Sequence, residues 1–128
     1  MAYEVRVLED VFDEDLANLI DVDPLLVDVI NGILRELESD PWLGTEMRKR
    51  NRLEILADCR KIPFDVSGRR GKPRFRLVYR NDPDDGSIAV VTVLAAGARS
   101  DLDAYRKAAT RLGSERRRER GRPRRGVN

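Results

Sequence analysis

Four short stretches of the chain have the residue pattern of β-strands. Apolar and polar residues alternate most clearly in Tyr3–Val7 and Phe75–Arg80, which is the two-residue period of a half-buried strand. Residues 55–64 and 87–96 are also strand-like, and segments rich in Gly, Pro, Asn and Asp separate the last three stretches. Because these links are short, we expect the last three strands to pair as an antiparallel meander.

Three other segments carry apolar residues at helical spacing. A first helix would place Phe12, Leu16, Leu19 and Ile20 on one face. A second is predicted from the N-cap Asp23 to residue 38, before Ser39-Asp40-Pro41 ends it. A third would begin near Ser100 and bury one face of four residues: Leu102, Tyr105, Ala109 and Leu112. The two N-terminal helices are expected to pack through their apolar stripes.

The order of elements predicts an α+β fold in a single domain over residues 1–113. Two N-terminal helices would pack on an antiparallel sheet of about four strands, followed by a short C-terminal helix. The apolar pattern stops at Gly113, and residues 114–128 contain seven arginines and three Gly or Pro residues. We therefore expect residues 114–128 to form an arginine-rich disordered tail.

Composition narrows the class of protein. The chain has 128 residues, of which 38% are charged, with one cysteine and no histidine. An internal disulfide and a multi-cysteine zinc site are therefore excluded, and we expect neither a metal nor a cofactor. The longest apolar runs are too short to span a bilayer and no signal peptide is visible, so the expected location is cytoplasmic, without membrane attachment.

Charge is strongly segregated along the chain. Residues 1–46 hold 13 Asp or Glu and 2 Arg, whereas residues 47–128 hold 23 Lys or Arg and 10 Asp or Glu. Such a basic half favours binding of a polyanion, because nucleic-acid affinity comes largely from neutralised phosphates. The acidic half would then face solvent or a basic partner.

The basic residues recur on the predicted strands. In residues 74–80, Phe75, Leu77 and Tyr79 occupy one parity, and the opposite parity holds Arg74, Arg76 and Arg80. A two-residue period would place these three guanidinium groups on one sheet face. That face is suited to phosphate.

Four segments together resemble the RelE/ParE toxin superfamily, and the RelE branch most closely. They are Asp58-Cys59-Arg60-Lys61-Ile62, Phe75-Arg76-Leu77-Val78-Tyr79-Arg80, Val93–Arg99 and Ala104–Leu112. The resemblance implies the toxin of a type II toxin–antitoxin system, acting as a ribosome-dependent mRNA endonuclease (mRNA interferase) without a metal. It would inhibit translation until a cognate antitoxin binds it in a toxin–antitoxin hetero-oligomer.

The resemblance also implies roles for four residues. Lys61 matches a lysine near the attacking 2′-hydroxyl, as base or charge stabiliser. Arg76 matches the arginine that holds the scissile phosphate. Arg99 matches a proton donor or phosphate contact, and Tyr105 matches a tyrosine that stacks on or orients the nucleotide. One position departs from the RelE pattern, because Pro63 stands where a second basic residue usually follows the lysine.

Other basic residues are candidate RNA contacts, and Arg60, Lys72 or Arg74 could replace the charge missing at Pro63. The full predicted RNA-binding set is Arg60, Arg69, Arg70, Lys72, Arg74 and Arg80. Structural alternatives remain at this point. Lys61 could simply face solvent, Arg76 could pair with Asp58 or Asp65, and Tyr105 could belong to the core.

Two other functions remain open from the sequence. One is a ParE-like DNA gyrase inhibitor without nuclease activity, which Pro63 favours. The other is a noncatalytic basic nucleic-acid-binding module that uses the arginine-rich tail.

Cleavage of RNA through the RNA's own 2′-hydroxyl needs a proton acceptor, stabilisation of the phosphorane and a proton donor. Without histidine, these groups must come from lysine, arginine, tyrosine or carboxylate side chains.

Overall fold

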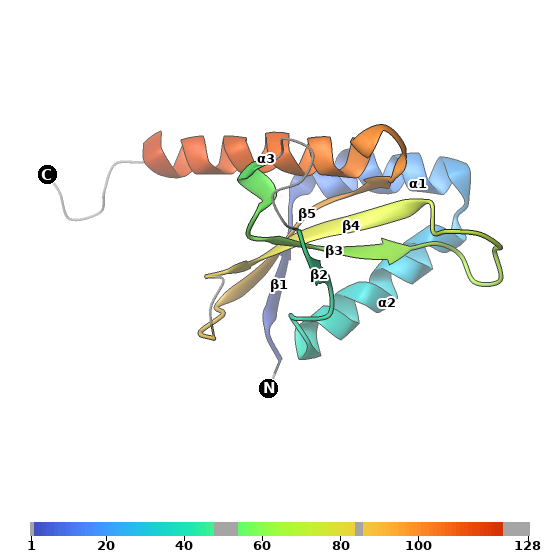
Figure 1. Cartoon of the computed structure of the whole chain (residues 1–128), viewed down its shortest axis with the longest axis horizontal. Coiled ribbons are helices and arrows are strands. Elements are labelled where there is room, and N and C mark those ends of the chain that lie inside the picture. Colours follow the sequence, from blue (N-terminus) through green and yellow to red (C-terminus); the bar gives the residue numbers. More distant parts are fainter. Residues whose placement is uncertain (1, 48–53, 84–85, 122–128) are drawn as a thin grey trace, which may run out of the picture.

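The computed structural model describes residues 2–47, 54–83 and 86–121. Five strands form one sheet in the order β1-β5-β4-β3-β2 (Figure 1). Their bounds are β1 Glu4–Val7, β2 Thr45–Glu46, β3 Cys59–Phe64, β4 Phe75–Asp82 and β5 Val90–Ala98. β1 runs parallel to β5, and every other neighbouring pair is antiparallel.

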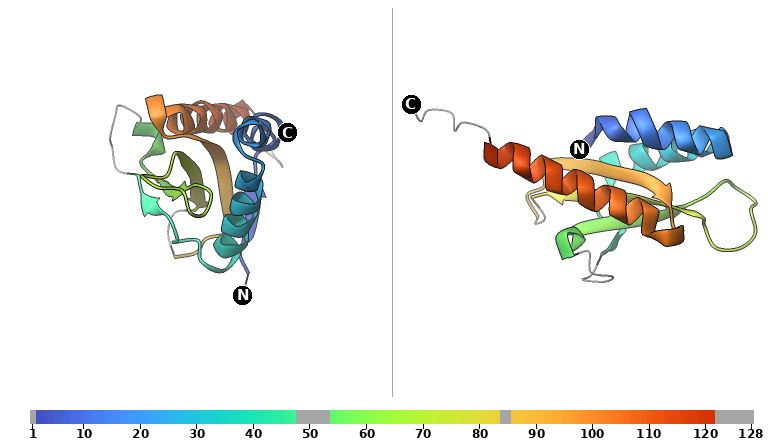
Figure 2. Two further views of the ribbon diagram at one scale, coloured as in Figure 1. Left: turned by 90° about the vertical axis from the view of Figure 1, so that its right-hand side faces the viewer. Right: turned by 90° about the horizontal axis from the view of Figure 1, so that it is seen from above.

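Helices cover both faces and one edge of this sheet (Figure 2). A π-helical turn, η1 (Val11–Asp15), leads into α1 (Leu16–Val22), which is followed by α2 (Leu25–Ser39). Two short 3-10 turns, η2 (Glu54–Leu56) and η3 (Ser100–Leu102), precede β3 and α3 (Asp103–Gly121). In Figure 2, α3 lies over one face and α2 lies on the other, while α1 lies outside the edge of the sheet.

The predicted α+β class is confirmed, with differences in the sheet. The predicted meander exists as β3, β4 and β5, but the sheet has five strands and is mixed rather than antiparallel. The parallel β1–β5 pair is possible because the long intervening chain supplies the crossover that parallel strands need. β2 has only two residues, Thr45 and Glu46, and is too short to leave an alternating pattern.

The register of β3 and β4 assigns every side chain to one of two faces. Phe64 pairs with Phe75 and Ile62 with Leu77, and the two phenylalanine rings stack with centroids 5.7 Å apart. These side chains lie on the face that α2 covers, here called the α2 side. The alternate residues, including Lys61 and Arg76, therefore lie on the opposite face, the α3 side.

The predicted packing of the first helix is wrong at two positions. Leu19 is buried, but Phe12 is 55% exposed and Ile20 is 47% exposed. The buried residues of η1 are instead Val11 and Asp15. Asp15 accepts hydrogen bonds from Arg111 of α3 and from the backbone N–H of Ala96. A buried ion pair thus determines which face of the helix turns inward, and an apolar periodicity cannot reveal it.

The predicted start of the tail is also wrong, because α3 does not end at Gly113. It continues to Gly121, so Ser114–Gly121 is helical. Arg and Glu are good helix formers, and Glu115 forms ion pairs with Arg118 at 3.4 Å and with Arg6 of β1 at 3.3 Å. Residues 122–128 of the predicted tail lie outside the described residues. Among the described helices, none is long and apolar enough to cross a membrane.

Candidate functional site

Lys61 and Arg76 lie on the α3 side of the sheet, on adjacent strands. Lys61 pairs with Val78, and Arg76 pairs with Pro63. The two basic residues are therefore diagonal neighbours, at a typical separation of about 7–8 Å, with their Cβ atoms somewhat closer. Arg76 donates to the carbonyl oxygens of Pro73 and Phe75 at 2.9 and 2.8 Å. It forms no ion pair with a described residue, so its positive charge is not neutralised within the described chain.

Arg99 extends the same region from the end of β5. Arg76 pairs with Gly97, two residues before Arg99, and the Arg99 N–H donates to the Arg74 carbonyl at 2.8 Å. Arg99 is exposed. Asp101 and Leu102, which follow it, have positive φ angles of 55° and 57°. Such backbone strain is often found at functional sites. Lys61 and Arg76 thus share one face on adjacent strands, and Arg99 follows β5 beside the residues where β4 begins.

A carboxylate lies within this basic region. An ideal Cβ atom at Gly97 would be 2.8 Å from Oδ2 of Asp103, the first residue of α3. The missing side chain at Gly97 therefore makes room for Asp103 beside the Arg76 position. The carboxylate also accepts a long hydrogen bond from Ala98 N at 3.4 Å and pairs with Lys107 at 3.4 Å.

Tyr105 is largely buried in the hydrophobic core, with 8% of its surface exposed. Its hydroxyl forms no hydrogen bond with any residue in the described part of the chain. The structure therefore gives Tyr105 a packing role at the beginning of α3. Contact with a nucleotide stays a prediction.

Pro63 occupies an open edge of the sheet and does not interrupt β3. Cys59 O accepts from Met47 N at 2.9 Å, so the backbone polar groups of Cys59 point toward β2. By alternation, those of Lys61 and Pro63 point the same way. β2 pairs only with Arg60 and Lys61, so Pro63 lies beyond its end. A missing N–H there breaks no bond to β4, which is how edge strands tolerate proline.

Arg60 and Arg74 are engaged in other contacts. Arg60 projects to the α2 side, where it lies 4.8 Å from the centroid of the Trp42 ring and donates to Gly44 O at 2.7 Å. Arg74 precedes β4 and forms a bidentate pair with Asp65, at 3.0 Å from Nε and 2.9 Å from Nη2. Arg60 therefore lies on the wrong face to replace a cation at Pro63, and the charge of Arg74 is neutralised by Asp65.

Arg80 lies on the same face of β4 as Arg76, but toward the opposite end of the strand. The fully buried Val78 lies between them on that face. Arg80 lines a hollow of about 180 Å³ beneath the C-terminal half of α3, together with Arg6 and Arg116. Its Nε is buried without a hydrogen-bond partner among the described residues. Arg80 is therefore separated from Arg76, but it lies two residues from Val78, the partner of Lys61, and is the second diagonal neighbour of Lys61.

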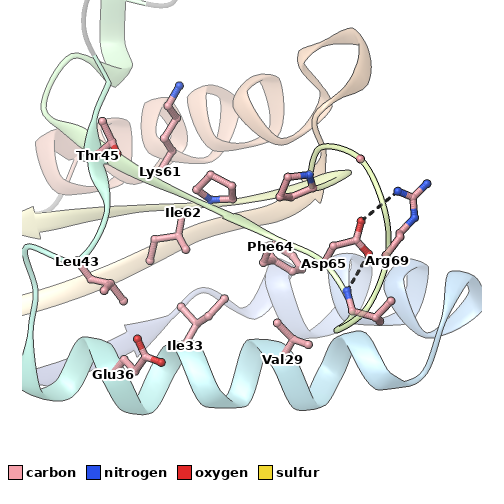
Figure 3. Close-up of a pocket in the computed structure, with 14 residues that line it drawn as sticks. Val29, Ile33, Glu36, Leu43, Thr45, Lys61, Ile62, Phe64, Asp65 and Arg69 are labelled. Atoms are coloured by element: carbon pink, nitrogen blue, oxygen red, sulfur yellow. Dashed lines mark hydrogen bonds and ion pairs between the residues drawn. The ribbon is translucent and has the colours of Figure 1, made fainter.

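The β3–β4 loop carries the other predicted RNA contacts: Arg69, Arg70 and Lys72. All three are exposed, and Arg69 pairs with Asp65 at 3.8 Å. Beneath this loop lies a groove of about 450 Å³ between α2 and β3. In Figure 3, Ile62 and Phe64 point toward α2, whereas Lys61 and Thr45 point to the opposite side. The loop and Lys61 thus border the same open edge of the sheet.

This arrangement can bind a phosphodiester and stabilise added negative charge. Guanidinium and ammonium groups form charge-assisted hydrogen bonds with phosphate oxygens. Fixed cations aimed at developing charge are a large source of catalysis, because they need no reorganisation during the reaction. Asp103 adds a potential proton acceptor, and Thr45, which pairs with Lys61, adds a hydroxyl.

Sequence reasoning missed the last two residues as parts of this region. In the sequence, Ser100 and Asp103 have only the spacing of a helix-capping box, and no pattern predicts the two-residue strand that contains Thr45. The one available signal was Gly97, a glycine within a strand, which often marks a close approach of another group.

This sheet order, with one helix over one face and a helical pair over the other face and edge, defines a RelE/ParE-like fold. Among solved structures, the chain is similar to a mutant form of the E. coli toxin RelE in the free state, with a TM-score of 0.59 and 23% identity. The alignment covers 87% of this chain and 98% of that one. No protein-family model and no curated protein sequence matches the chain.

Proposed function

We propose that this protein is the toxin of a type II toxin–antitoxin pair and cuts messenger RNA on the ribosome. The observation that carries the proposal is that Lys61 and Arg76 lie on one face of a RelE-like sheet, beside β5, which Arg99 directly follows. The proposal includes a metal-independent reaction, a cytoplasmic location, and a cognate antitoxin that blocks the toxin.

In this proposal, Arg76 holds the scissile phosphate and stabilises the charge that develops on it. Lys61 lies beside the attacking 2′-hydroxyl and either accepts its proton or stabilises its negative charge. Arg99 contacts the phosphate near the leaving 5′-oxygen. Because Lys61 and Arg76 are only partly buried, the ribosome would supply positioning and exclude water, which together can account for much of the rate.

The test compares wild type with Arg76→Ala on ribosomes programmed with messenger RNA, and naked RNA is the control substrate. We expect cleavage only on ribosomes, and a loss of about 10²–10³-fold in the variant, as for removal of one charge-stabilising donor. Arg35→Ala on α2 is the matched control, because Arg35 is an exposed arginine on a helix away from the α3 side.

Equal cleavage by Arg76→Ala would remove Arg76 from the mechanism. No cleavage by correctly folded wild type would contradict the nuclease proposal. The second candidate would then be a ParE-like inhibitor of DNA gyrase, which is favoured by Pro63 at a position where RelE proteins usually have a cation. Inhibition of gyrase supercoiling by wild type, retained in Arg76→Ala, would support that alternative.

A further inference from the structure

The outer face of η1 and α1 carries an apolar stripe that no described part of the chain covers. Phe12 and Ile20 are 55% and 47% exposed, and the partly buried Leu16 lies between them. We call these three residues the α1 stripe. Spaced four residues apart, they span about 12 Å along the helix axis. Figure 2 shows α1 at the periphery, with no other helix or strand on its outer side.

Uncompensated acidic residues surround the α1 stripe. Glu9 and Asp13 flank Phe12, and Asp21 follows Ile20. None of these three carboxylates forms an ion pair with a residue in the described ranges. The chain has no lysine or arginine between residues 7 and 34.

Cations from α3 neutralise the other side of the same segment. Arg111 pairs with Asp10, Glu14 and Asp15, and Lys107 also pairs with Asp15. The inward side of η1 is therefore balanced by the protein's own basic residues. The outward side has negative charge beside apolar surface, and both properties are available to a partner.

We propose that the α1 stripe is a docking surface for a basic amphipathic helix of another protein. Exposed apolar residues gathered on one face commonly mark an interaction site, and an amphipathic helix buries such a stripe with spaced apolar anchors. Lysine or arginine beside those anchors would pair with Glu9, Asp13 and Asp21. Opposite charges at the rim speed association and select the partner.

The same charges argue against other occupants. Nucleic acid and anionic lipid surfaces would be repelled by the three carboxylates. A second copy docking through the same surface would place these carboxylates opposite each other, because a two-fold interface is self-complementary. A cationic protein segment is the remaining chemistry. The inference is independent of RNA cleavage, although under the proposed function the antitoxin is the partner to examine for such a helix.

The test uses full-length protein and a synthetic helical peptide of leucine and lysine, about five turns long, with all leucines on one face. Fluorescence anisotropy of the labelled peptide reports binding. We expect Phe12→Ser combined with Ile20→Ser to weaken binding by about tenfold or more, as loss of central apolar anchors does. Glu9→Gln, Asp13→Asn and Asp21→Asn together should weaken binding similarly and reduce its dependence on salt.

Matched controls distinguish binding to the α1 stripe from nonspecific effects of exposed apolar residues and of negative charge. Leu43→Ser removes another exposed apolar residue, and the triple variant Glu4→Gln, Glu36→Gln and Glu38→Gln removes three other exposed charges. Each control should change the affinity less than about twofold. A leucine–glutamate peptide should not bind.

Three outcomes would overturn the proposal. They are absence of leucine–lysine peptide binding to wild type, equal binding by the stripe variants, and equal loss in the controls. Circular dichroism verifies that each variant is folded. Because the assay contains no RNA, its result does not depend on whether the nuclease proposal holds.

Discussion

At the scale of single residues, Asp65 organises the basic loop beside the candidate site. It accepts three hydrogen bonds from Arg74, two from the guanidinium and one from the backbone N–H, and it pairs with Arg69. The Arg74 hydrogen bonds outweigh the opposing effect of burial and hold the pKa of the Asp65 carboxyl well below its ordinary value of 3.8. A lowered carboxyl pKa means that the ionised form stabilises the fold.

This shift predicts how stability depends on pH. Because the folded-state pKa is lower, the contribution of Asp65 is complete above its ordinary pKa and is lost as pH falls through the folded-state value. We expect Asp65→Asn to be less stable than wild type at neutral pH. The difference should shrink below about pH 4. Urea unfolding across the pH range measures it, and Asp28→Asn, an exposed carboxylate on α2, is the control. A pH-independent difference would contradict the assignment.

At the scale of elements, α3 offers a direct test of its length. Gly113 lies inside the helix, and a Cβ there would meet Arg117 Nη1 at 3.5 Å and Ile55 Cδ1 at 3.8 Å, which are ordinary contacts. Gly113→Ala should therefore raise the free energy of unfolding by about 0.5–1 kcal/mol, as expected for a helix interior. A destabilised variant would indicate that the helix ends at Gly113. Gly32→Ala, inside α2 with no atom near its Cβ, is the positive control.

The elements of the candidate site were predictable to different degrees. Periodicity located β3, β4 and β5, and the motif resemblance selected Lys61, Arg76 and Arg99. Only the register shows that Lys61 and Arg76 share a face while Arg60 lies on the other. Register depends on pairing between strands, which no single strand's pattern encodes. The Asp65–Arg74 pair likewise depends on how the β3–β4 loop folds back.

At the scale of the whole molecule, Asp15 and Arg111 join three distant segments. Arg111 donates to Asp15 at 2.7 Å and to Leu94 O at 3.0 Å, and Ala96 N donates to Asp15 at 2.8 Å. The pairing of β5 with β1 ends at Val93. These bonds therefore give hydrogen-bond partners to backbone groups of β5 that lie beyond β1. Burial alone would lower the pKa of Arg111, but its acidic partners outweigh that effect and raise it.

Removing one member of this buried pair should be costly. We expect Asp15→Ala to lower the free energy of unfolding by about 3–5 kcal/mol, because Arg111 would remain as a buried charge without its main partner. The neighbouring Asp13→Ala is the control, since Asp13 is exposed, and should stay within about 0.5 kcal/mol of wild type. Thermal or urea unfolding measures both. A loss below about 1 kcal/mol for Asp15→Ala would mean that the pair contributes little to stability.

The sequence by itself determined the α+β class, the location of most elements and the separation of acidic and basic halves, because these follow from local periodicity and composition. It also supplied the family resemblance. Only the tertiary structure decided which face of the first helix is buried, where α3 ends, and which cations converge. Those outcomes depend on residues far apart in the chain, such as Asp15 with Arg111 and Gly97 with Asp103, whose contacts exist only after the strands have paired.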